Sequence, residues 1–112
     1  MTGFEIYNKA ILRLGYNGSI NDRLIERAPE LMKQIAEDLK LDCIIRLSEE
    51  IKVGDNIAEA LCCGLAMLLA LSESDGEKHK LYCDIYNAKR AAVLSTSCKV
   101  EDKLPVAESG DV

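Results

Sequence analysis

Aromatic residues and histidine are scarce in this sequence. Its 112 residues include no tryptophan, one phenylalanine, four tyrosines and one histidine. So few rings give little material for a platform on which nucleic-acid bases stack, and we expect the tyrosines to pack in the core or at an interface. His79 lies between Lys78 and Lys80, where we expect an exposed side chain rather than a general base.

Metal-binding and phosphate-binding motifs are also missing. The chain has no C-x-x-C pair, no G-x-G-x-x-G loop and no P-loop. We therefore expect no cofactor, no metal site and no enzyme. The cysteines are odd in number, which does not fit a disulfide framework, and we expect small buried thiols in a reducing cytoplasm: Cys43, Cys62, Cys63, Cys83 and Cys98.

Excess positive charge is missing too, because the formal net charge is -5. An acidic chain does not fit a protein that binds nucleic acid through a broad basic face, and we expect no sequence-specific contact with nucleic acid. We interpret the densest basic positions as solvated helix faces: Lys9, Arg13, Lys78, Lys80, Lys89 and Arg90.

The main positive feature is an uninterrupted apolar run over residues 60–71. It contains no β-branched residue and is rich in strong helix formers, so it predicts a central buried helix with Asp55 as N-cap and Leu71 near its end. The run is about a dozen residues long, whereas a membrane span needs about 20, so we expect no membrane partner.

Small residues form a row along this helix at Cys62, Ala66 and Ala70, with Gly64 beside it. A glycine within a helix costs about 1 kcal/mol relative to alanine, and close packing of a neighbouring helix would offset this cost. A small domain can hardly cover every side of such a helix. We therefore expect the row or its opposite side to be exposed as a subunit contact.

Two helices are predicted before the apolar run. Thr2 and Glu5 have the spacing of a capping box, Gly15 follows the last apolar position, and a turn is expected over residues 16–21. The apolar face of this first helix is expected to be Phe4, Tyr7, Ile11 and Leu14.

The second helical pattern begins near Asp22 and contains Pro29. The proline either lies in the first turn of the main helix, after a short helical turn, or kinks the helix. After the central helix, Ser74 and Glu77 have capping-box spacing for a last helix. Its expected apolar face, flanked by Tyr82 and Val93, is Leu81, Ile85, Ala88 and Ala92.

These patterns predict an all-α fold, a bundle of three to four helices with a central apolar helix, in which the last two helices are antiparallel neighbours. We assign residues 1–95 to a helical domain, residues 41–53 to a crossover connection, and residues 96–112 to a polar C-terminal tail that is expected to be flexible. Our candidate partner-binding residues are apolar positions of the connection and the tail: Leu41, Ile44, Ile45, Val100, Leu104, Pro105 and Val106.

Four short motifs follow one another along the chain. They are residues 10–16 (AILRLGY), 64–70 (GLAMLLA) with Ser72, Glu73 and Asp75 after them, 86–90 (YNAKR) and 100–105 (VEDKLP). In this order the chain resembles the small helical head-tail connector proteins of tailed phages and prophages, also called adaptor or head-completion proteins. The resemblance covers residues 4–105, and Pro29 departs from its pattern.

The resemblance implies a structural virion protein that acts in viral assembly and DNA packaging. Copies of it would form an oligomeric ring beneath the portal protein and extend the DNA channel, with the neck or tail-completion protein below. It would be located at the head-tail junction of the virion, and in the bacterial cytoplasm during assembly. Negative charge would keep such a channel from binding DNA, and the tail would become ordered on docking. The alternative is a small helical regulatory or scaffold-like protein-interaction module.

Overall fold

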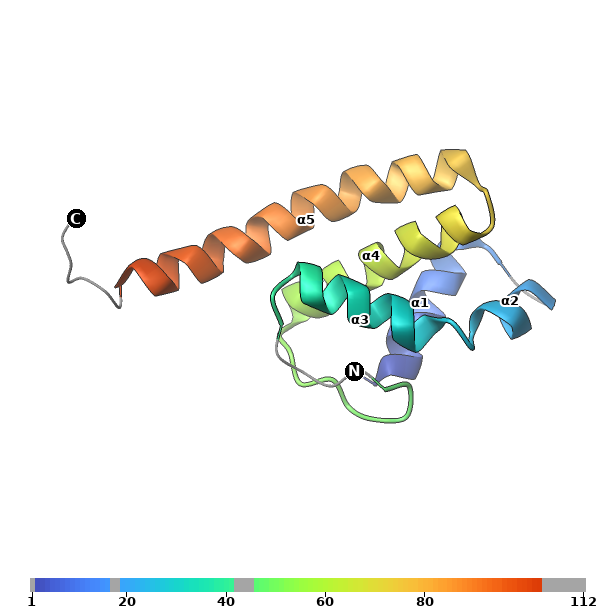
Figure 1. Cartoon of the computed structure of the whole chain (residues 1–112), viewed down its shortest axis with the longest axis horizontal. Helices are drawn as coiled ribbons and strands as arrows, with labels where there is room; N and C mark the ends of the chain where they lie inside the picture. Colours follow the sequence, from blue (N-terminus) through green and yellow to red (C-terminus); the bar gives the residue numbers. More distant parts are fainter. Residues whose placement is uncertain (1, 17–18, 42–45, 104–112) are drawn as a thin grey trace.

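The computed structural model describes residues 2–16, 19–41 and 46–103, the last eight of them by their backbone. Within these residues the elements are α1 (Gly3–Leu14), α2 (Ser19–Leu24), α3 (Ala28–Asp38), α4 (Asp55–Ser72) and α5 (Gly76–Lys103). The helices α4 and α5 lie side by side and antiparallel, and α1 and α3 pack against α4 (Figure 1). The prediction of an all-α bundle around a central apolar helix is confirmed.

Both ends of α1 are capped. The predicted capping box is present, because the N–H of Glu5 donates to the Thr2 hydroxyl at 3.1 Å and the N–H of Thr2 donates to the Glu5 carboxylate at 2.7 Å. The hydrogen bond from the Thr2 backbone lowers the pKa of Glu5. At the other end Gly15 adopts a left-handed conformation with φ 75°, as expected of a helix C-terminus.

An irregular segment, residues 46–53, also contacts the start of α1. The N–H of Gly3 donates to the carbonyl of Glu49 at 3.2 Å, and the N–H of Phe4 donates to the carbonyl of Leu47 at 2.9 Å. Both groups lack a partner within the helix. A Cβ atom at position 3 would lie 2.9 Å from the Leu47 Cα, so glycine permits this approach. The placement of Phe4 on the core face is wrong, because its side chain is 45% exposed.

Pro29 lies in the first turn of α3, where its missing N–H breaks no helical hydrogen bond. Of the two predicted alternatives, the short helix before the proline is therefore the one observed, and this helix is α2. The turn predicted over residues 16–21 is wrong from Ser19 onward, since α2 begins there. The guanidinium of Arg23 in α2 donates twice to the Glu73 carboxylate, each time at 2.8 Å, and so joins α2 to the end of α4.

The central helix α4 is mostly buried, but not in the way expected. The row of Cys62, Ala66 and Ala70 is at most 1% exposed, so the expectation that this row is an exposed subunit contact is wrong. The opposite side of α4 is the more open one: Leu68 is half-buried and Leu71 is 56% exposed. The N-cap is Gly54 rather than Asp55, which is the first residue of the helix.

Among the described helices, α4 is the one that is long and apolar enough to cross a membrane by length and composition. It has 18 residues with a mean hydropathy of 1.4, so the argument from the shorter apolar run does not apply to the whole helix. Core helices pass the same test, and 56% of α4 is buried inside the molecule against α1, α3 and α5.

Both α3 and α5 approach α4 closely at Gly64. A Cβ atom at this position would lie 2.7 Å from Cγ2 of Ile35 in α3 and 2.9 Å from Cε1 of Tyr86 in α5. Both distances are shorter than van der Waals contact, so a residue without a side chain lets α3 and α5 reach the same point of α4. The close packing expected around Gly64 is therefore observed.

The helix α5 packs on α4 through a different face from the predicted one. Its buried side chains are two aromatic rings and a valine: Tyr82, Tyr86 and Val93. The predicted apolar face is wrong for three exposed residues: Leu81, Ala88 and Ala92. Ile85 of that face is half-buried and packs against the core, and the predicted flanking residues Tyr82 and Val93 are buried. The observed face buries more apolar area because aromatic rings are the largest side chains available on this helix.

Both ends of α5 differ from the prediction. Its N-cap is Asp75, whose carboxylate accepts a hydrogen bond from the Lys78 N–H at 3.4 Å, whereas Ser74 adopts a left-handed φ of 57°. The helix continues to Lys103, past residue 95, so the first part of the predicted tail is helical. No glycine or proline interrupts it before Pro105, and it extends beyond the start of α4 (Figure 1). Residues 104–112 lie outside the described part of the chain.

The contact at Gly64 predicts a large effect of a side chain there. Gly64→Leu is expected to lower the free energy of unfolding by about 1–3 kcal/mol, because the core must move to admit the new atoms. Gly76→Leu adds the same side chain at the exposed start of α5, where no atom lies within 4 Å of the new Cβ, and should change stability by less than about 0.5 kcal/mol. Urea denaturation checks both values. Equal stability of the two variants would contradict the close packing.

Candidate functional site

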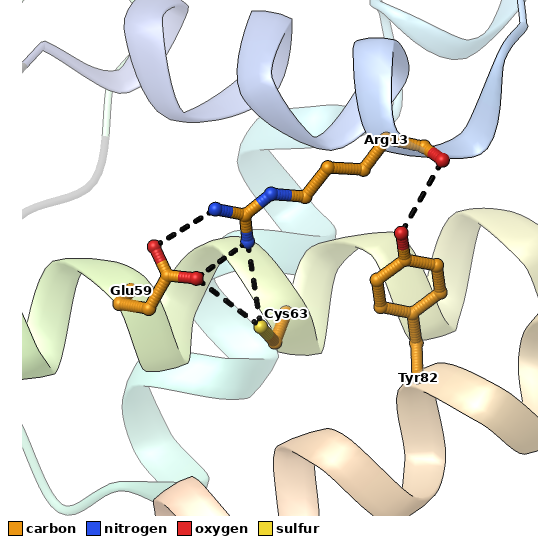
Figure 2. Close-up of polar contacts among 4 residues, drawn as sticks. All are labelled: Arg13, Glu59, Cys63 and Tyr82. Carbon is orange, nitrogen blue, oxygen red and sulfur yellow. Dashed lines mark hydrogen bonds and ion pairs between the residues drawn. The ribbon is translucent and has the colours of Figure 1, made fainter.

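A polar cluster joins α1, α4 and α5 around Arg13 (Figure 2). The Arg13 guanidinium lies 2.6 Å from one carboxylate oxygen of Glu59 and donates to the other at 3.1 Å. It also donates to the Cys63 sulfur at 3.6 Å. The Tyr82 hydroxyl of α5 donates to the Arg13 backbone carbonyl at 3.3 Å. This one residue of α1 therefore contacts both helices of the α4–α5 pair.

The protonation states of this cluster are fixed by its contacts. The hydrogen bond between Arg13 and Glu59 raises the pKa of the guanidinium and lowers the pKa of the carboxyl, so the pair stays charged. Burial raises the pKa of the Cys63 thiol, and it raises the pKa of Cys62 to about 11. A thiol reacts as a nucleophile in its thiolate form. The cluster therefore holds helices together without activating its cysteine.

A second polar cluster closes the C-terminal end of α1. The Tyr16 hydroxyl donates to the Asp75 carboxylate at 2.8 Å, and this bond lowers the pKa of Asp75. Burial, followed by that bond, raises the pKa of Tyr16 to about 12. The Lys78 ammonium donates to the Leu14 carbonyl and lies 4.9 Å from the centre of the Tyr16 ring. The negative end of the helix dipole stabilises a cation at this position, and the Tyr16 ring also attracts it.

These contacts correct two predictions about polar residues. Lys78 and Arg90 are half-buried and bind acidic groups or carbonyls of the same chain, so the interpretation as solvated helix faces is wrong for these two. Arg13 is exposed, as interpreted, but it is paired with Glu59. His79 is half-buried, and its Nδ1 lies 3.0 Å from the Met67 carbonyl, so the expectation of an exposed histidine is wrong as well.

Of the three cysteines whose side chains the structure describes, two lie in the core. Cys62 and Cys63 are buried and free, as predicted, and Cys83 is free and half-buried. Cys43 and the side chain of Cys98 lie outside the described part. In the described ranges, no three His, Cys, Asp or Glu residues come together in a group that could hold a metal ion.

The predicted partner-binding residues fall in different places. Leu41 follows α3, where its N–H donates to the Ala36 carbonyl at 2.8 Å and its side chain packs against the core. Val100 lies in the last turn of α5, three residues before its end at Lys103. The other predicted positions lie outside the described residues, and their role stays a prediction: Ile44, Ile45, Leu104, Pro105 and Val106.

Two hollows flank α5 on the surface. One, of about 670 Å³, lies where the start of α4 meets residues 89–93 of α5. The other, of about 450 Å³, lies between α3 and α5, and we call it the α3–α5 groove. Its apolar lining residues are Ile35, Met67, Leu68 and Tyr86.

The rim of the α3–α5 groove carries charge. Asp38 accepts hydrogen bonds from the Tyr86 hydroxyl at 2.6 Å and from Nε of Arg90 at 2.8 Å. Sequence reasoning missed this site because Asp38 and Arg90 are 52 positions apart and no local spacing marks such a pair. The sequence did indicate the apolar floor of the groove. Leu68 lies on the side of α4 opposite the row of small residues, and that side is one of the two that the sequence predicts as a subunit contact.

The chain matches no protein-family model, no curated protein and no solved structure.

The Arg13–Glu59 pair predicts a pH-dependent loss of stability in Glu59→Gln. Because the pKa of Glu59 is lowered in the folded state, its stabilising effect is present above the ordinary carboxyl pKa of about 4.3 and is lost as the pH falls through the lower folded value. The variant should be less stable than the parent at pH 7, by under about 1 kcal/mol for a partly exposed pair.

Urea denaturation from pH 7 down to pH values below the ordinary carboxyl pKa measures this difference. Glu37→Gln is the matched control, because Glu37 is exposed and has no side-chain partner among the described residues. A difference between Glu59→Gln and the parent that stays constant over the whole range would contradict the ion pair.

Proposed function

We propose that this protein is a structural head-tail connector subunit of a tailed phage or prophage, which joins the portal protein to the neck or tail and extends the DNA channel. The proposal gives the chain a role in assembly and no catalytic step. It needs a rigid helical body and surfaces for the portal, for the next protein and for further copies of the same chain.

One observation carries the proposal: the first three of the four motifs behind the resemblance contact one another in space. Tyr16, which ends the first motif, donates a hydrogen bond to Asp75, which follows the second motif. Gly64, which opens the second motif, lies against Tyr86, which opens the third. The motifs are far apart in the sequence, and these contacts join them into one structural unit.

The shape and the charge of the chain support the same function. The end of α5 extends beyond the start of α4 (Figure 1), and the helix continues past Val100 to Lys103. The net charge of -5 gives DNA little to bind, and this suits a subunit of a channel through which DNA must slide. The polar clusters described above hold helices together, which is the work of a structural protein.

Mixing the full-length chain with the portal protein of the same genome tests the proposal. The expected product is a ring-shaped complex, seen by electron microscopy and light scattering. Val100→Glu should weaken portal binding by more than about tenfold, because it puts a charge on the projecting end of α5. Leu12→Glu is the control, since Leu12 is 79% exposed on α1, away from this end.

A stable dimer that does not bind the portal would contradict the connector function. It would favour the alternative of a small regulatory or scaffold-like interaction module. Equal portal binding by Val100→Glu and the parent would remove the projecting end of α5 from the interface.

A further inference from the structure

The helix α5 leaves one apolar flank uncovered. Leu81 is 53% exposed and Ala88 is exposed, whereas Ile85 between them is half-buried and packs partly against the core. The three side chains lie within about 60° of one another around the helix axis, and we call them the α5 stripe. The small Ala88 would allow a second element to approach closely. This flank faces the side of α1, because Lys78 and Tyr82 of the same helix bond to the C-terminal end of α1.

The opposite flank of α5 borders the α3–α5 groove. Tyr86 and Arg90 line this groove, and Arg90 is nine positions from Leu81, or about 180° around the helix. The floor of the groove is apolar, with Leu68 half-buried and Leu71 of the same helix 56% exposed nearby along α4. The helix α5 therefore has the apolar α5 stripe on one flank and the apolar α3–α5 groove on the other.

The charges beside the two surfaces are complementary. Asp84 is exposed one turn from Leu81 and from Ala88, and its carboxylate has no partner among the described residues. On the groove, Arg90 uses Nε to bond Asp38 and is 39% exposed, while its two terminal nitrogens bond no described residue. An arginine can bind a second carboxylate through those nitrogens. The carboxylate of Asp84 beside the α5 stripe can therefore accept hydrogen bonds from the guanidinium of Arg90 on the α3–α5 groove.

We infer that the α5 stripe of one copy docks in the α3–α5 groove of a second copy, with Asp84 of one copy against Arg90 of the other. The two surfaces differ and lie on opposite flanks, so each copy contacts one neighbour on each side, head to tail. Contacts of this kind close into a ring or grow into a filament. The closure into a ring rests on the proposed function, whereas the contact itself rests on the α5 stripe, the α3–α5 groove and the charges.

Sedimentation of the full-length chain over a concentration series up to the millimolar range tests the contact. The parent is expected to form species larger than a dimer. Leu81→Glu and Asp84→Arg should raise the concentration of half-assembly by more than about tenfold. Both positions are exposed, so neither variant should change the thermal unfolding of the chain. Leu12→Glu, at a leucine that is 79% exposed and lies outside both surfaces, should assemble like the parent.

A mixing experiment tests the pairing of position 84 with position 90. Asp84→Arg alone places two positive charges in the contact, and Arg90→Glu alone places a carboxylate beside Asp38 and against Asp84 of the neighbour, so each should fail to assemble. An equimolar mixture restores opposite charges at every contact and should assemble again. A parent that stays monomeric at every concentration, one that stops at a dimer, or a Leu81→Glu variant that assembles like the parent would overturn the inference. A mixture of folded variants that stays dissociated would overturn it too.

The outcomes also separate this inference from the proposed function. A chain that assembles through α5 and ignores the portal keeps the contact and loses the connector function. A chain that forms rings on the portal, while Leu81→Glu does so equally well, keeps the function and loses the contact.

Discussion

The close approach of three helices at Gly64 is the constraint on which the rest of the structure depends. With no side chain at this position, Ile35 of α3 and Tyr86 of α5 both reach the surface of α4. The contact with Tyr86 fixes how α5 is rotated about its own axis. Once Tyr86 faces α4, Tyr82 one turn earlier faces the same side and meets the Arg13 carbonyl. The same rotation turns Leu81 and Ala88 outward.

The polar clusters determine how the helices are placed relative to one another more than they stabilise the fold. Partly exposed ion pairs such as Arg13–Glu59 contribute under about 1 kcal/mol each, whereas burial of a single large apolar side chain contributes about 1.5–3 kcal/mol. Their value lies in placement. Arg13 sets α1 against Glu59, Lys78 caps the end of α1, and Arg90 ties α5 to Asp38 of α3. Each helix around α4 is thereby held at one register.

Much of the fold could be predicted because its signals are local. The capping box at Thr2 and Glu5, the break in the helical pattern at Pro29 and the apolar run of α4 each depend on neighbouring residues. Gly64 could be assigned to a close contact because a glycine within a helix needs a packing reason. These features place four of the helices and identify the central one.

The rotation of α5 could not be predicted in the same way. Two apolar stripes lie side by side on this helix, one through Leu81 and Ile85 and one through Tyr82 and Tyr86, and both have helical spacing. The hydrophobic periodicity of the sequence predicts both stripes but does not determine which of them packs against α4. The candidate surfaces depend on this choice. The prediction that the row of small residues around Ala66 is exposed is wrong for the same reason, because the burial of this row depends on which neighbouring helices cover it.

Exposure of the leucine methyl groups in solution tests the central claim most directly, because the rotation of α5 decides it. Methyl NMR spectra of the dilute full-length chain with a soluble paramagnetic probe should show strong broadening of the Leu81 signals, as for Leu12, and little broadening for Leu65 and Leu69 in the core. At high concentration the Leu81 signals should become protected while those of Leu12 stay broadened. Protection of Leu81 equal to that of Leu65 in the dilute monomer would contradict the packing of α5 described here.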